Sequence, residues 1–512
     1  MLNRQTGLAW KYHDLTRHSY FSVRSSPHYL DWENRPSPFK VYPDAPSIAL
    51  PRELAPSGYP LLEAIAFDGQ GGEAERTPTL EELASLLFYS AGVLRTKTYP
   101  AGVIYFRAAA CAGALYPVEV YVACKDIEGL AAGVYHFSPG DFSLKCLRKG
   151  DHRSIIVDAA GGEPRVARAP VILIYSAISW RSSWKYRDRA YRYHYWDNGT
   201  IVANALAMAR GLEVPASLVM GFVERDINRL VGIDGERELA LSLLAFGLDS
   251  QGAPPAPVPV DLNQSTIPLS AREADYPSIR EMHAASSLAD EEEVAAWHEG
   301  KYEKVVPPAS GRQVPLSAPG NDSLPGDSIE EVIARRASTR RFARKALPFQ
   351  DMSIILDRST RGFSSDFGHS PCAQLNDLYA IVNRVDGLEP GAYFFRRGDG
   401  ALELLKGGSF SDKAAYLTLD QALGGDSAFT LFFMADLKGI LESFGNRGYR
   451  AAQMESSVVG GKAYLAAYAL RRGATGLTFY DDDVTEFFSP HAAGKSCIFA
   501  VAVGVPGKRP IY

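Results

Sequence analysis

An internal repeat constrains the fold of this chain more than any other feature. The stretches EVYVACKDIEGLAAGVYHF, from Glu119, and DLYAIVNRVDGLEPGAYFF, from Asp377, share six identical residues at equal spacing. Each shared residue of the second stretch lies 258 positions after its counterpart in the first. The same offset pairs RAYR, from Arg189, with RGYR, from Arg447. One offset that holds over several separate segments predicts two copies of one fold.

Helix-type and strand-type patterns alternate within each copy. In the first copy, TLEELASLLFYSAG (79–92) has leucines at helical spacing and a Thr-x-x-Glu start that is typical of a capped helix. A Tyr- and Val-rich strand, a hairpin, a buried strand, a long helix from about Trp196 and a last strand are expected to follow. Such interleaving indicates a layered α+β domain. We therefore expect two tandem α+β domains, at residues 1–250 and 327–512.

The segment between the copies, residues 251–326, has the composition of a linker or strap. GAPPAPVPVDL and VVPPASGRQVPLSAPGNDSLPG are Pro-rich and extended, and DEEEVAAW between them could form a short helix. A disordered tether is the simpler interpretation, but the apolar VPVDL favours partial docking of the linker onto the domains.

Composition limits the functional class. The chain has 512 residues, a formal charge of −5 and a pI near 6.1, which argue against a general nucleic-acid binder. No apolar run is long enough to cross a membrane, and MLNRQTGLAW lacks the pattern of a signal peptide. Five scattered cysteines without a metal-binding spacing favour a reducing compartment, and no HExxH motif is present. We expect a cytoplasmic protein without nucleic-acid, membrane or metal partners.

A basic cluster, RRASTRRF (335–342), follows a helix-type segment that Ser328 and Glu331 can cap. On an extended backbone, Arg336, Ser338 and Arg340 would point to the same side and converge on one small anion. Phosphate is the natural candidate, because the arginine guanidinium group binds it through two parallel hydrogen bonds. From spacing alone, a solvated basic helix end is the simpler interpretation.

Three segments resemble the nitroreductase-like flavin enzymes, and most closely their SagB-type (thiazole/oxazole-forming oxidase) dehydrogenase branch in a tandem two-domain form. They are RRASTRRF, RAAACAGALYPVEVYV from Arg107, and WKYRDRAYRYHYWDNGT from Trp184. The resemblance implies that the two copies pack as an intramolecular pseudo-dimer with FMN in the cleft between them. It also implies that Arg336, Ser338 and Arg340 bind the phosphate of FMN.

The resemblance assigns further cofactor contacts to both copies. The first copy would supply a loop of small residues over the flavin ring, and the second a turn at the ring edge and late basic residues at the phosphate. These residues are Cys111, Ala112, Gly113, Ala114 and Leu115 in the first copy, and Thr475, Gly476, Lys508 and Arg509 in the second. The repeat places Leu218 opposite Gly476, and the basic segment TRHSYFSVR (16–24) matches the phosphate motif only loosely. We therefore expect one FMN per chain.

Lys185 and Tyr186 are the candidate catalytic pair, because relatives that oxidise azolines are thought to need such a pair. Hydride transfer to flavin requires a base for the accompanying proton, and a desolvated lysine or a tyrosine can serve. The repeat aligns the pair with Ser443 and Phe444, so only the first copy retains it. Packing of the two side chains in an aromatic-rich segment is the alternative.

Three functions are consistent with these features. The first is an FMN-dependent oxidoreductase that dehydrogenates a small-molecule, modified-peptide or amino-acid-derived substrate. The second is a nitro- or quinone reductase that takes its electrons from NAD(P)H. The third is a flavin- or peptide-binding scaffold that has lost turnover.

Overall fold

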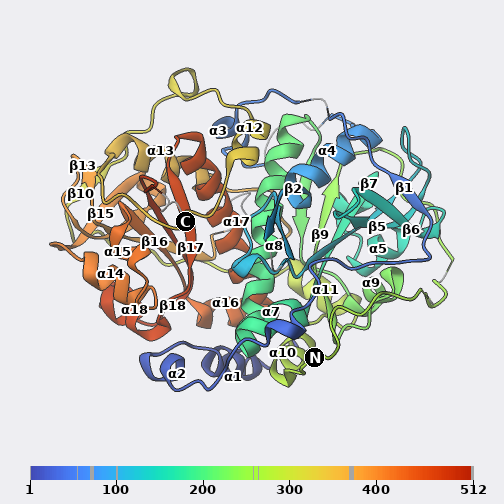
Figure 1. Cartoon of the computed structure of the whole chain (residues 1–512), viewed down its shortest axis with the longest axis horizontal. Coiled ribbons are helices and arrows are strands. Elements are labelled where there is room, and N and C mark those ends of the chain that lie inside the picture. The colour runs from blue at the N-terminus through green and yellow to red at the C-terminus, as the bar shows by residue number, and fades with distance from the viewer. Residues whose placement is uncertain are drawn as a thin grey trace.

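Two seven-stranded antiparallel sheets, one in each half of the chain, form the framework of the molecule (Figure 1). This computed structural model describes residues 2–54, 56–69, 74–99, 102–257, 259–262, 264–367 and 374–508. The first sheet has the order β1-β6-β5-β4-β7-β9-β8 and the second β10-β15-β14-β12-β16-β18-β17. The strands correspond one to one, which confirms the two α+β copies.

The strands of the first sheet are β1 (Ser47–Ala49), β4 (Val118–Cys124), β5 (Gly133–Ser138), β6 (Ser143–Lys149), β7 (Val171–Ile178), β8 (Ala216–Val219) and β9 (Glu238–Phe246). Those of the second are β10 (Gln313–Pro315), β12 (Asn376–Val382), β14 (Gly391–Arg396), β15 (Ala401–Gly407), β16 (Phe429–Ala435), β17 (Gly473–Leu477) and β18 (Ser496–Gly504). Two small ribbons pair β2 (Val93–Tyr99) with β3 (Gly102–Arg107) and β11 (Leu347–Pro348) with β13 (Val385–Asp386).

The helices of the first half are α1 (Gly7–Leu15), α2 (Tyr20–Arg24), α3 (Leu61–Ala64), α4 (Leu80–Ala91), α5 (Arg153–Ala159), α6 (Pro164–Ala167), α7 (Ser179–Tyr186), α8 (Ala190–Gly211) and α9 (Glu224–Val231). Then follow α10 (Pro277–Ala285), α11 (Glu291–His298), α12 (Ile329–Arg335), α13 (Phe349–Thr360), α14 (Ser411–Leu417), α15 (Ala422–Asp426), α16 (Leu437–Phe444), α17 (Arg447–Ala469) and α18 (Asp481–Phe488). The predicted caps of α4 and α12 are present, because Thr79 with Glu82 and Ser328 with Glu331 each form a capping box. Helix α8 begins at Ala190, ahead of the predicted start at Trp196.

The helices α8 and α17 pack against each other between the two sheets (Figure 1). A Cβ added to Gly199 would lie 1.8 Å from Ser457 Oγ, and one added to Gly461 would lie 2.7 Å from Ala203 Cβ. In both contacts the two residues are 258 positions apart in the chain. Residues that meet their own counterparts lie near a two-fold axis, so the two halves form a pseudo-dimer.

The arginines of the repeated RxYR motif form ion pairs that hold the two halves together. Arg189 and Arg192 of the first half bind Asp481 of the second, at 2.9 and 2.6 Å, and all three side chains are buried. In return, Arg447 and Arg450 of the second half bind Glu224 of the first. Removing one partner from such a buried pair is strongly destabilising, so interface geometry explains why both copies retain the motif.

The linker and the N-terminal segment both pack on the second half. Strand β10 lies inside the predicted linker, yet it pairs with β15 at the edge of the second sheet. The amide side chain of Asn446 binds the chain at Leu2, Gln5 and Ala9. Partial docking of the linker is therefore confirmed, while the domain boundaries at residues 250 and 326 stay predictions. None of the described helices is both long and apolar enough to span a bilayer.

Candidate functional site

Two adjoining cavities lie between the halves of the molecule. The inner cavity, of about 460 Å³, is lined by the loop 110–114, by α8, and by β17 of the second half. The outer cavity, of about 610 Å³, is lined by the β2–β3 ribbon and by residues 336–341. The two share Ala110, Cys111, Ala114, Ser338 and Arg340 among their lining residues. Both halves thus contribute to one composite site, which we call the open cleft.

The loop 110–114 has a backbone that brings it close to the predicted catalytic pair. Gly113 has φ 63°, in the left-handed region that favours glycine. A Cβ added there would lie 2.9 Å from Tyr186 Oη and 3.3 Å from Lys185 Nζ. The loop, Lys185 and Tyr186 therefore meet at the inner cavity. Leu115, in contrast, packs with Trp180 and Trp184 and is not among the described residues that line the two cavities.

The carboxylate of Asp197 holds this loop in place through two hydrogen bonds. The backbone N–H of Ala112 donates to its carboxylate at 2.8 Å, and Cys111 Sγ donates at 3.1 Å. The side chain lines the inner cavity and is almost fully buried, and burial raises its pKa to about 7. No sequence motif pointed to Asp197. The available signal was a lone acidic residue in the helical stretch AYRYHYWDNGTIVANALAMARG.

Burial shifts the two predicted catalytic groups in opposite directions. Tyr186 stacks on Tyr193, with ring centroids 4.1 Å apart, and burial raises the pKa of its hydroxyl well above the ordinary value. Burial lowers the pKa of Lys185, and the charges of Arg340 and Arg35 add to this effect. The site can therefore present a protonated phenol beside an amine that releases its proton more readily than usual.

The predicted phosphate motif reaches the cleft in a way that its spacing did not reveal. The guanidinium of Arg336 is buried and donates to the carbonyls of Ala108 and Arg107, at 2.9 and 3.1 Å. It thereby fastens the first-half loop to the second half, and burial lowers its pKa. Ser338 and the exposed Arg340 line both cavities, and all three motif residues line the outer one.

Two other predicted basic residues are not placed in the cleft. Lys508 is exposed and is not among the described residues that line either cavity, and Arg509 lies outside the described residues. The sequence analysis also missed four cations of the outer cavity. These cations are Arg95, Lys97, Arg107 and Arg341. The alternation of basic residues in LRTKTY was a local signal for the first two.

Thr475 and Gly476 lie on β17, the edge strand of the second sheet, and both line the inner cavity. The N–H of Gly476 donates to the hydroxyl of Tyr464. A Cβ added to Gly476 would lie 3.4 Å from Phe499 and 3.5 Å from Tyr464 Oη, which are ordinary van der Waals distances. Because both residues line the inner cavity, a ligand in that cavity can reach this edge of the sheet.

The repeat-related position in the first half, which we call the filled cleft, is different. Leu218 on edge strand β8 donates its N–H to the carbonyl of Ser364 at 3.0 Å and accepts the N–H of Asp366 at 3.1 Å. The carboxylate of Asp366 in turn accepts from Gly221 N and Trp297 Nε1, at 2.6 and 3.0 Å. A backbone segment of the second half thus covers the edge that corresponds to the one at Gly476.

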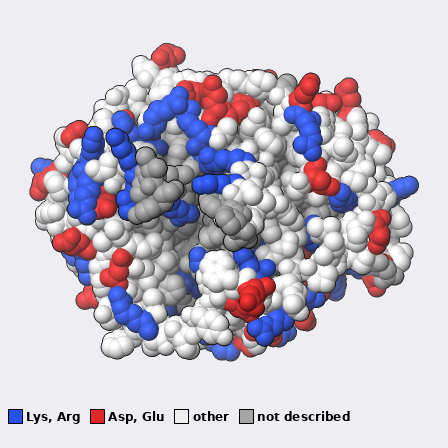
Figure 2. Space-filling view, viewed as in Figure 1, with Lys and Arg blue, Asp and Glu red and all other residues white. Residues whose placement is uncertain are grey.

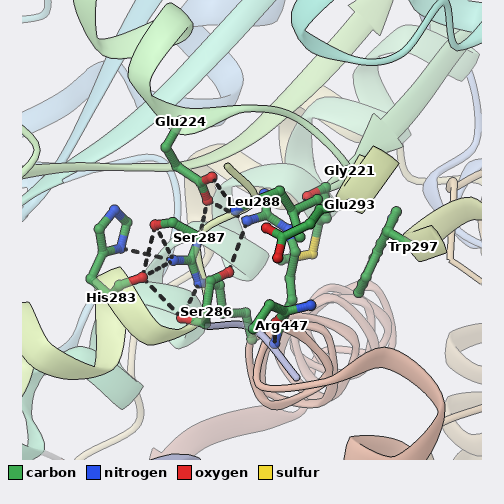
Figure 3. Close-up of polar contacts among 12 residues, drawn as sticks. Gly221, Glu224, His283, Ser286, Ser287, Leu288, Glu293, Trp297 and Arg447 are labelled. Carbon is green, nitrogen blue, oxygen red and sulfur yellow. Dashed lines mark hydrogen bonds and ion pairs between the residues drawn. The ribbon is translucent and has the colours of Figure 1, made fainter. Parts of the chain in front are cut away.

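Helix α11 of the linker fills the rest of this cleft. Trp297 packs against Phe444, the counterpart of Tyr186, with ring centroids 5.1 Å apart. A Cβ added to Gly221 would lie only 2.3 Å from Trp297. Figure 3 shows polar contacts of the residues just before α11. Glu224 accepts from Leu288 N at 2.9 Å, and Arg447 donates to the carbonyl of Ser286 at 3.1 Å. Among the described residues, Trp297 and the segment 364–366 thus occupy the position that corresponds to the inner cavity.

The filled cleft also has no concentrated cation cluster among its described residues. The helices α4 and α13 begin 269 residues apart, so residues 65–79, between α3 and α4, correspond to 336–348. They help to line a cavity of about 490 Å³ in which acidic and basic side chains mix: Glu75, Arg76, Arg210, Glu213 and Lys462. The segment 16–24 is not the counterpart, because it lies along the second half, where Arg24 pairs with Asp420 at 2.8 Å.

Comparisons with known proteins locate the family signal in the first half. The profile of the Nitroreductase family matches residues 73–248. "Putative nitroreductase MJ1384" from Methanocaldococcus jannaschii is 30% identical over 169 residues, which cover 33% of this chain and 80% of that protein. The "Microcin B17-processing protein McbC" from Escherichia coli is 27% identical over 176 residues, 33% of this chain. That match spans only 61% of McbC, less than two thirds of its length.

The crystal structure of a nitroreductase described as putative, from Anabaena variabilis, extends the similarity to both halves. It matches 98% of this chain and 99% of its own, with a TM-score of 0.76 and 24% sequence identity. At this identity the match establishes the shared tandem fold.

Proposed function

Because this chain belongs to the nitroreductase family of oxidoreductases, we propose that it is an FMN-dependent oxidoreductase with one flavin site, in the open cleft. One observation carries the proposal. A loop of small residues, an accessible strand edge and a cation-rich rim converge only there among the described parts of the two clefts. FMN has the corresponding parts: a flat ring, polar ring edges and a phosphate.

The residues present fit FMN part by part. The loop 110–114 and Trp196 would contact the ring, and β17 would face its edge at Thr475 and Gly476. Ser338 and Arg340 lie where the two cavities meet, which suits the phosphate at the far end of the ribityl chain. Arg336 would act mainly by holding the loop, since its guanidinium already binds two carbonyls. Once bound, FMN would supply a hydride acceptor or donor.

Lys185 and Tyr186 would handle the proton that accompanies the hydride. The lowered pKa of Lys185 increases the fraction of neutral amine, which can accept a proton from a substrate in the inner cavity. The raised pKa of Tyr186 keeps its hydroxyl protonated, so it can donate a hydrogen bond that orients the substrate. The carboxyl of Asp197 fixes the loop against which the substrate and the ring would pack.

For the substrate, we favour a modified peptide or an amino-acid-derived compound that is dehydrogenated. This rests on the SagB-type resemblance and on the similarity to McbC, whose printed name describes processing of microcin B17. A nitro- or quinone reductase fed by NAD(P)H is the alternative. A cytoplasmic location is part of the proposal, because the described cysteines Cys111, Cys124, Cys146 and Cys497 are free, which fits a reducing compartment.

The test is reconstitution of purified protein with FMN, removal of excess FMN, and measurement of flavin absorbance, followed by anaerobic addition of NADPH. Retained flavin supports the proposal. Bleaching by NADPH would favour the reductase alternative, and retained flavin without bleaching would favour the dehydrogenase. A protein that stays colourless after reconstitution would refute both.

A further inference from the structure

The outer cavity has more positive charge than one cofactor phosphate requires. Six cations line it, and none of the described lining residues is acidic: Arg95, Lys97, Arg107, Arg336, Arg340 and Arg341. Its volume of about 610 Å³ falls within the range of about 300–1,000 Å³ that whole small-molecule sites have. Figure 2 shows Lys and Arg side chains gathered around a hollow near the middle of this face. The cavity therefore has both the space and the charge for a second ligand.

Two of these cations are already committed to the fold. Arg107 is buried and donates to the carbonyl of Pro38 at 2.6 Å. Arg336 is buried and donates to two carbonyls of the first half. Both remain sources of positive potential, but neither guanidinium is free to reorient toward a ligand.

The remaining cations divide between the two cavities. Arg340, beside Ser338, lines both and is placed for the cofactor's phosphate. Arg95 on β2 and Arg341 line only the outer cavity of the two, together with Lys97. Neither Arg95 nor Arg341 has a carboxylate partner among the described residues. Arg95 instead donates to the carbonyl of Arg336 at 3.3 Å and lies over the ring of Phe106.

A phosphate monoester carries only about −1.5 to −2 charges at neutral pH. A cluster of like charges without acidic partners raises the potential of the unliganded protein and attracts anions. The charges of Arg340 and of the buried Arg336 together already match the charge of the cofactor's phosphate. The further charge at Arg95 and Arg341 is therefore in excess and indicates a second anionic group.

We propose that Arg95 and Arg341, with Lys97 at the same rim, form a second anion subsite that takes a diphosphate or other phosphorylated group of the second substrate. This rests on the proposed function, because it assumes that FMN occupies the inner cavity. The cavities share five lining residues, so a ligand anchored at the outer subsite can extend a reactive end toward the ring. A nucleotide electron donor and a smaller phosphorylated substrate share this chemistry.

The experiment titrates FMN-loaded protein with sodium pyrophosphate by calorimetry at low salt. The variant is Arg95→Ala with Arg341→Ala; both side chains are exposed, so the fold should be retained. The matched control, Arg52→Ala with Arg225→Ala, removes two exposed charges that line neither cavity. We expect the variant to bind pyrophosphate about tenfold or more weakly, with its flavin-to-protein ratio unchanged and the control like the wild type.

Competing ligands distinguish the sources. Displacement of pyrophosphate by ADP but not by glycerol phosphate identifies a nucleotide, and displacement by both identifies a smaller phosphorylated group. Three results would overturn the subsite: no pyrophosphate binding by FMN-loaded wild type, equal binding by the variant, or loss of flavin from the variant. Binding of a polyglutamate peptide without binding of pyrophosphate would also overturn it, in favour of an acidic peptide. A wild type that takes up no FMN refutes the proposed function itself.

Discussion

The open and filled clefts occupy equivalent positions in two copies of one fold, and they differ in what covers the edge strand. At β17, the N–H of Gly476 meets a tyrosine hydroxyl, and a cavity lies beyond it. At β8, Leu218 is paired with a backbone segment, and Trp297 fills the adjoining space. The strand orders and the central helices correspond in the two halves, so the difference in what covers the edge strand comes from loops and the linker.

The comparison separates residues that serve the interface from residues that serve a site. Both copies retain the RxYR arginines, because each pair closes a buried ion pair across the halves. Only one copy retains Lys185 and Tyr186. Of their counterparts, Phe444 packs against Trp297 of the linker, and the carbonyl of Ser443 accepts a hydrogen bond from Arg4 of the N-terminal segment. A site could decay in one copy without loss of the fold because the interface contacts do not depend on it.

The largest effect should come from Arg336→Ala combined with Arg340→Ala. Arg340→Ala removes a hydrogen bond to a charged group, worth about 1.5–3 kcal/mol, and Arg336→Ala releases the loop that Arg336 fastens. Flavin affinity should therefore fall by about 10²-fold or more, and the purified protein should be colourless. The matched change in the filled cleft, Arg76→Ala with Arg210→Ala, should leave flavin content unchanged. Equal flavin loss from both variants would abolish the distinction between the clefts.

Lys185→Ala should lower turnover by about 10²–10⁴-fold, the usual contribution of general acid–base catalysis, without loss of flavin. Lys185→Arg should fail to restore turnover, because arginine cannot release its proton. Steady-state rates with measured flavin content provide the test, and Ser443→Ala is the control from the filled cleft. Full activity in Lys185→Arg would show that only the positive charge matters.

Trp297→Phe tests the filling of the second cleft. The change removes the hydrogen bond to the buried carboxylate of Asp366, which should lower the free energy of unfolding by about 1–3 kcal/mol. Flavin content and turnover should stay at wild-type values, because Trp297 does not line the open cleft. Denaturant unfolding measures the first effect. A second flavin bound by this variant would mean that the linker alone closes the cleft.

A further prediction concerns the pH dependence of Asp197, whose counterpart across the repeat is Glu455. Its folded-state pKa of about 7 lies above the unfolded value of about 3.9. Between these values the folded state holds a proton that the unfolded state has lost, so the stabilisation falls as pH rises through this window.

Relative to Asp197→Asn, the wild type should lose at most about 1.4 kcal/mol of unfolding free energy per pH unit over that range. Urea unfolding of both proteins at several pH values provides the measurement. If the difference in unfolding free energy between the two proteins does not change over this pH range, burial does not raise the pKa of Asp197.

The sequence patterns predicted the repeat and the caps of α4 and α12, and the family resemblance implied the convergence of Ser338 and Arg340 with the loop 110–114. The sequence could not predict the roles of Asp197 and Arg95, because these roles depend on contacts between residues far apart in the sequence. Such contacts leave no recognisable local sequence pattern. The sequence analysis also misplaced the first-half counterpart of the phosphate motif, since the repeat offset changes from 258 at the strands to 269 at α4 and α13. The sequence predicted a short helix at DEEEVAAW, which is α11, and partial docking of the linker, but it did not predict that α11 occupies the filled cleft.

The most direct test of the central claim is the ratio of bound flavin to protein after saturation with FMN and removal of the excess. The ratio combines flavin absorbance with an independent protein determination, such as amino-acid analysis. One FMN per chain is predicted, because of the two clefts, as far as the structure describes their residues, the open cleft alone combines a strand edge that lines a cavity with clustered cations. A ratio near two would contradict the asymmetry of the clefts, and a ratio near zero would contradict the flavin site itself.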